Sequence, residues 1–177
     1  VRYADGVRVT LMPVADAMTS SNAPDENYAA EAQVQVNRSY LRTFVKFDLS
    51  ALPADAQLHL ARFKMLASGG FAYGGDGNVY SHLVTDDTWS PETITASNEP
   101  SVVNAHCGFW WLWYDGTPRD AWGVNASPLL RPVVQGELTG DGTLSLRLHS
   151  PGYRTQYYRA GHADETKRPV LEVVYTR

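Results

Sequence analysis

The sequence predicts an all-β domain, an antiparallel β-sandwich of the jelly-roll type. Strand-like stretches recur along the chain, and turn-forming groups such as Gly69-Gly70 and Gly140-Asp141-Gly142 separate them. No window of a dozen residues shows a convincing helical period of 3.6. Many short strands with dense turns and no intervening helices are typical of a sandwich.

Length and composition fit one domain, residues 1–177, with a single core. The formal net charge of −4 argues against a dedicated nucleic-acid binder. No apolar run approaches about 18 residues, so no membrane partner is expected. The first residues lack a signal-peptide pattern, which still fits a mature or excised module of a secreted protein. We expect a monomer, with Cys107 buried as a small apolar residue.

Seven strands are expected between the turn signals, and residues 128–134 could hold one helical turn. In chain order the strands are residues 7–12, 32–36, 40–49, 58–66, 79–84, 143–149 and 170–175.

Two of these strands carry basic residues on one side. Side chains of a strand alternate between its faces, so Val45 and Phe47 should point inward, opposite Phe44 and the cations. In residues 58–66, Phe63 and Met65 share the inward side. The expected outward cations are Arg42, Lys46, Arg62 and Lys64.

These cations could form a grid that binds an anionic chain. Neighbouring strands lie about 4.8 Å apart, and residues on one face of a strand lie about 6.6 Å apart. A uronate or sulfated polysaccharide presents charges at comparable intervals, and Arg suits carboxylates. The alternative is a solvated face whose Arg and Lys stems cover apolar surface.

Further candidates for ligand contacts come from aromatic and basic residues. Tyr80 and His82 share one side of their strand, as do Arg147 and His149. If these strands lie beside the basic ones, they extend the same groove. Residues 109–114 are a continuous apolar run, so either Trp110 or Trp111 should face outward.

Residues 153–159 mix aromatic and basic side chains directly after a turn. Tyr157 and Arg159 are therefore candidate ligand contacts, with capping of one sandwich end as the alternative.

Several stretches resemble a known family. Residues 47–56 (FDLSALPADA) lead into the strand with Arg62, residues 87–95 (DTWSPETIT) centre on Trp89, and residues 168–175 (RPVLEVVY) close the chain. Residues 15–17 and 26–28 match the opening. In this order they resemble the DNRLRE-type β-sandwich modules, which include the family 96 carbohydrate-binding modules. The resemblance implies that Trp89 is structural.

The resemblance also implies a function. Such modules are non-catalytic, are secreted, and are appended to enzymes that degrade polysaccharides; alginate is among the known ligands. We therefore expect an extracellular module that binds an acidic polysaccharide and targets an attached catalytic domain.

Two other functions stay open, and whether the chain is an enzyme is uncertain, with the balance against it. Residues 38–42, 57–59 and 157–161 bear a passing likeness to motifs of jelly-roll alginate lyases, which act on uronate polymers by β-elimination. Such lyases need a cation near the uronate and a His or Tyr to move protons. A structural or adhesive cell-surface module is the third possibility.

No cofactor is required for binding, and the five histidines lack the spacing of a zinc site. A structural calcium ion is the alternative, held by oxygen-rich loops around Asp16, Asp25 and Asn27, or around Asp76 and Asn78. Such residues more often simply form turns.

Overall fold

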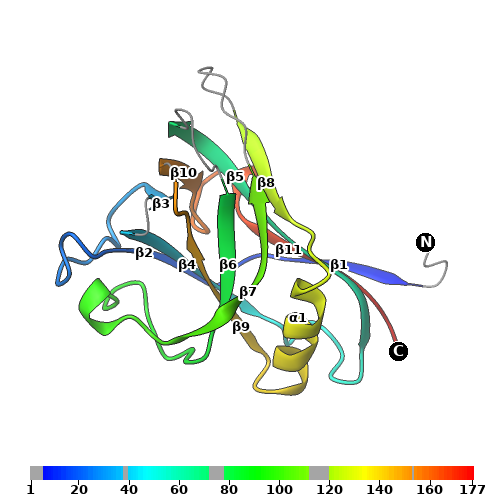
Figure 1. The fold of residues 1–177 in the computed structure, drawn as a ribbon. Coiled ribbons are helices and arrows are strands. Elements are labelled where there is room, and N and C mark those ends of the chain that lie inside the picture. The colour runs from blue at the N-terminus through cyan, green and yellow to red at the C-terminus, as the bar shows by residue number, and fades with distance from the viewer. Residues whose placement is uncertain (1–5, 38–39, 72–77, 112–119, 153) are drawn as a thin grey trace.

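A computed structural model describes residues 6–37, 40–71, 78–111, 120–152 and 154–177. It confirms the all-β sandwich, because the strands form two antiparallel sheets whose inner faces share one core (Figure 1). No helix in these ranges is long and apolar enough to cross a bilayer.

Sheet A has six strands and sheet B has five. In spatial order, sheet A contains β1 (Val7–Leu11), β11 (Val170–Thr176), β5 (Gln57–Phe71), β10 (Arg154–Tyr158) and β3 (Gln33–Val36), and β8 (Ala121–Asn125) pairs with β5. Sheet B contains β2 (Ala15–Ser20), β4 (Leu41–Asp48), β9 (Thr143–His149), β6 (Asn78–Val84) and β7 (Val102–Trp111).

One helix is longer than the single turn expected. The helix α1 spans Leu130–Thr139 and buries Leu130, Val134 and Leu138, which are four residues apart and share one face. Pro132 is tolerated because it lies in the first turn, where backbone N–H groups lack helical partners anyway. Two short 3-10 turns, η1 (Ala96–Asn98) and η2 (Glu165–Lys167), complete the described helices.

The core lies between the sheets, and alternation correctly identified its residues in β4 and β5. Val45, Phe47, Phe63 and Met65 are fully buried. The ring of Phe63 contacts Phe47 and Trp110 edge-on, each with centroids 5.8 Å apart. Burying each such ring stabilises the fold by about 2–3 kcal/mol.

A second, smaller cluster lies outside the core, on the outer face of sheet B. Residues 85–101, the green loop in Figure 1, fold back so that Trp89 and Ile94 pack on Phe44 and Val84. Phe44 is therefore buried rather than exposed beside the cations, which corrects the expectation. Trp89 is structural, as expected, because the residue is only 8% exposed and its Nε1 donates to Ser145 Oγ.

Candidate functional site

The expected four-cation grid does not exist. Arg42 and Lys46 lie on β4 in sheet B, whereas Arg62 and Lys64 lie on β5 in sheet A. The outer faces of two stacked sheets point in opposite directions. Strands that are consecutive in the sequence of a sandwich can belong to different sheets. Alternation predicts which side of a strand is buried, but it does not predict the sheet to which the strand belongs.

Three of these cations also have partners within the protein. Arg42 Nη1 lies 3.0 Å from both carboxylate oxygens of Glu99. Lys46 Nζ donates to the carbonyls of Asp87 and Trp89 at 2.6 and 2.7 Å, and burial lowers its pKa. Lys64 Nζ lies 3.0 Å from Glu172 and over the ring of Trp122, while Arg62 is exposed.

Three further ligand candidates serve the fold instead. Trp110 is buried, and its Nε1 donates to the hydroxyl of the fully buried Tyr157 at 3.0 Å. Burial raises the pKa of Tyr157. Arg159 Nε lies 2.7 Å from Asp16 Oδ1, and the guanidinium also donates to the carbonyls of Ala29 and Glu31. An Arg held by this many partners fixes a loop.

The other candidates meet on the outer face of sheet B. In one cross-strand row, Tyr80 pairs with His149 on β9 and with Phe109 on β7. In the adjacent row, His82 pairs with Arg147 on β9 and with His106 on β7. The hypothesis that these strands lie beside the basic ones holds only in part: β9 pairs with β4, whereas β6 lies one strand further along sheet B and neither strand pairs with β5. We call this surface the histidine face; it comprises Arg42, Tyr80, His82, His106, Phe109, Arg147 and His149.

Rings cover much of the histidine face. The centroid of Tyr80 lies 5.3 to 5.6 Å from the centroids of His106, Phe109 and His149. The His82 and His149 rings lie 5.0 Å apart. Phe109 is 48% exposed, and Trp111 follows it on the same side at 52%. The outward tryptophan of residues 109–114 is therefore Trp111; residues 112–114 lie outside the described ranges.

Several polar atoms of this face lack a hydrogen-bond partner. Six buried side-chain atoms in the described part of the chain have none, and four of them belong to the histidine face. They are His82 Nε2, His106 Nδ1, Arg147 Nε and His149 Nδ1. Because an unpaired buried polar group is costly, such a concentration on one surface indicates a place for a polar ligand.

Burial keeps His82 and His149 on this face neutral at pH 7. Burial, followed by the neighbouring His82 and Arg147, lowers the pKa of His149 to about 4. Burial is also the main reason why the pKa of His82 is lowered. Burial and the proximity of Arg42 lower the pKa of Arg147. Arg147 has no direct ion pair among the described residues, although the nearby charge of Glu99 offsets part of its own.

His106 and Phe109 were missed because no strand was expected at β7. They are three residues apart and would normally face opposite sides of a strand. A register shift next to Gly108, whose φ is +138°, turns both outward. The signal that could have found them is the glycine within an otherwise strand-like run.

The residues expected to bind calcium have protein partners. Asp16 accepts from Arg159 and from the backbone N–H of Ala160. Asp25 accepts from Ser97 Oγ, and Asn27 donates to the carbonyls of Pro91 and Ile94. Asn78 Nδ2 donates to Tyr80 Oη at 3.4 Å, and Asp76 lies outside the described ranges.

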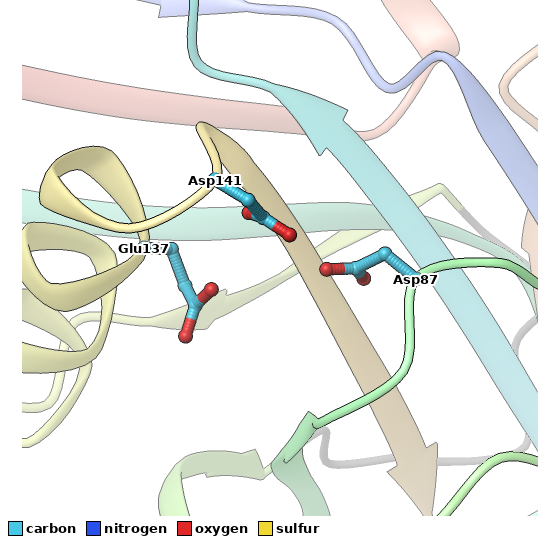
Figure 2. Close-up of side chains that lie close together, drawn as sticks. All are labelled: Asp87, Glu137 and Asp141. Atoms are coloured by element: carbon cyan, nitrogen blue, oxygen red, sulfur yellow. The ribbon is translucent and has the colours of Figure 1, made fainter.

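A different group of carboxylates does come together. Oxygens of Asp87, Glu137 and Asp141 lie within 4.8 Å of one another, where the end of α1 meets the turn before β9 (Figure 2). Burial, and then the charge of Asp141, raises the pKa of Glu137. Burial likewise raises the pKa of Asp87. No other group of three such donor atoms is this close in the described ranges.

The described residues that resemble alginate lyase motifs lie far apart in the structure, on different sheets or in the core. Residues 57–59 lie on β5 in sheet A, where His59 Nε2 lies 2.9 Å from Thr176 Oγ1. Tyr157 is fully buried in the core, while Arg42 is on sheet B. Residues 38 and 39 lie outside the described ranges. The described residues of the likeness therefore do not share one active site.

Comparison with known families gives one match that covers nearly the whole chain. The model of carbohydrate-binding module family 96 matches residues 7–175, from the first strand to the last. A search of curated proteins finds no match. The matched range contains both sheets and every residue of the histidine face, and the two-sheet architecture is the one that the sequence resemblance implied. The chain therefore belongs to carbohydrate-binding module family 96.

Proposed function

We propose that this module binds an acidic polysaccharide, such as alginate, across the histidine face. The observation that carries the proposal is the set of four buried, unpartnered polar atoms on that face. Arg147 supplies the fixed positive charge, and its Nε is free to donate to a carboxylate or sulfate. Tyr80 and Phe109 offer rings on which sugars stack through their apolar faces.

The geometry favours this surface over the sheet A cations. Rows of side chains follow the strand spacing of about 4.8 Å, which is close to the length of one pyranose ring. The loop formed by residues 85–101 covers the other end of the outer face of sheet B, so it limits the ligand to the histidine face. We further propose that the module is extracellular and directs an attached polysaccharide-degrading enzyme to its substrate.

The test compares two arginine substitutions by affinity electrophoresis in gels that contain alginate. Arg147→Ala removes the cation that has no direct ion pair and should weaken binding at least tenfold, since charge-assisted hydrogen bonds contribute about 1.5–3 kcal/mol. Arg62→Ala, on the opposite sheet, is the matched control and should bind as the wild type does. Gels with a neutral glucan should retard neither protein.

The opposite pattern would refute the proposal. If Arg62→Ala abolished retardation and Arg147→Ala did not, the ligand would bind sheet A. Recording ultraviolet absorbance during the same incubations separates binding from β-elimination, because a lyase generates an absorbing unsaturated product and a binding module does not.

A further inference from the structure

His82 is held in one tautomer by the backbone. Its Nδ1 lies 3.0 Å from the carbonyl oxygen of Val103 on β7. A carbonyl oxygen can only accept, so Nδ1 carries the hydrogen and donates it. In the neutral ring Nε2 is then a bare acceptor, and this is the atom that lacks a partner.

This acceptor lies in surroundings that suit an anion. His82 is 8% exposed. The groups around it are Tyr80 on its own strand, His106 on β7, and Arg147 and His149 on β9. Arg42 on β4 is paired with Glu99, and the charges of both residues act on Arg147. Among these residues, the charge beside His82 that has no direct ion pair is therefore positive, that of Arg147.

A bare acceptor cannot bond to an anion, which offers only acceptors. A carboxylate or sulfate oxygen can approach His82 Nε2 only when that nitrogen is protonated, and it then forms a charge-assisted hydrogen bond. A sugar hydroxyl, in contrast, can donate to Nε2 without any change in protonation. The two ligand groups thus predict opposite effects of pH on binding.

We propose that His82 binds the anionic group of the ligand through Nε2 and takes up a proton as the ligand binds, with Arg147 as the fixed charge beside it. This inference rests on the proposed binding of an acidic polysaccharide to the histidine face. Burial, with Arg147, lowers the pKa of free His82, and a bound anion raises it. Because Nε2 is buried, the ligand reaches it only after a neighbouring side chain rotates away, a motion that is fast for side chains at a surface.

The sign of the effect follows from linkage. In the free protein His82 is neutral at pH 7, and in the complex it is protonated. Affinity is therefore highest below the pKa of the free ring and falls as pH rises towards the pKa of the bound ring, by up to tenfold per pH unit for one proton. Uronate carboxyls titrate near or below the value of about 4 typical of carboxyl groups, so they stay ionised throughout this window.

The experiment is calorimetric titration of the wild type with soluble alginate at pH 7 in phosphate and in Tris. These buffers release protons with different enthalpies, so the difference in binding heat counts the protons taken up, and we expect close to one. Dissociation constants between about pH 5.5 and 8 should rise with pH. Because this measurement uses the wild-type protein, it does not require that a variant folds correctly.

Two substitutions at one position then test the residue. His82→Gln places an amide donor near Nε2 and should give binding that does not change with pH. His82→Asn keeps a donor near Nδ1 but lacks the outer nitrogen, so it should lose at least tenfold in affinity at pH 5.5. His59→Gln, on sheet A, should keep the pH dependence of the wild type.

Three outcomes would overturn the inference. If alginate binds with equal heats in both buffers and without pH dependence, no proton is taken up. That result refutes this inference but leaves the proposed function intact. Affinity that rises with pH assigns Nε2 to a sugar hydroxyl. No binding to alginate at any pH overturns both this inference and the alginate proposal.

Discussion

The buried His149 ring makes the folding stability of this protein depend on pH. Its pKa of about 4 lies below the ordinary value of 6.5 because the folded protein buries the ring next to other basic groups. A depressed pKa means that the unfolded chain binds the proton more tightly. Its contribution to stability is complete above about pH 6.5 and is lost as pH falls towards 4.

A substitution tests this link. His149→Gln removes the titrating group, so its melting temperature should fall by several degrees less than that of the wild type between pH 7 and pH 4.5. Thermal unfolding followed by circular dichroism measures both values, with Arg62→Ala as the control. If the melting temperatures of the wild type and of His149→Gln fell equally between pH 7 and pH 4.5, the His149 ring would be solvated rather than buried beside basic groups.

At the scale of the element, β7 depends on a single glycine. The φ of +138° at Gly108 is a conformation that other residues rarely adopt, and a Cβ built there would lie 2.2 Å from Asn125 Oδ1. This backbone geometry turns both His106 and Phe109 to the outer face. The strand can therefore contribute two rings only while residue 108 has no side chain.

Two glycine substitutions test whether the backbone conformation at Gly108, rather than any loss of a glycine, determines stability. Gly108→Ala should destabilise the protein by more than about 1 kcal/mol, because it combines a disfavoured φ with a clash against the side chains of Asn125 and Ser127. Gly136→Ala in α1, where a Cβ would meet nothing within 4 Å, should be neutral or stabilising by up to about 1 kcal/mol. Urea unfolding measures both, and a neutral Gly108→Ala would contradict the register shift.

For the whole molecule, a net charge of −4 must be reconciled with an anionic ligand. On the histidine face Arg147 has no direct ion pair among the described residues and Arg42 is paired with Glu99, whereas the Asp87, Glu137 and Asp141 carboxylates lie near the end of α1 (Figure 2). Attraction acts over short distances and repulsion over the whole molecule, so salt screens both.

The dissociation constant for alginate should consequently rise with salt concentration, but only slightly. Raising NaCl from about 0.05 to about 0.5 M should weaken alginate binding by only a few-fold, because few cations contact the ligand and the protein as a whole repels it. Affinity electrophoresis at both concentrations tests this. Unchanged or tighter binding in high salt would exclude a role for Arg147 as an ion-pairing partner.

The sequence by itself determined the sandwich and the inward residues of β4 and β5. Hydrophobic alternation is a local property, and it identifies the buried side of a strand wherever the strand lies. The same reasoning grouped Tyr80 with His82 and Arg147 with His149, because those pairs share a strand. The family resemblance likewise gave Trp89 its structural role.

Only the tertiary structure decided which strands are neighbours. Arg42 and Arg62 lie on consecutive strands of the chain, yet the connection between them crosses from one sheet to the other, so they face opposite sides. His82, His106 and Arg147 come from distant parts of the sequence and meet because β9, β6 and β7 pair side by side. Strand pairing is set by packing of the whole core, and no local pattern of residues encodes it.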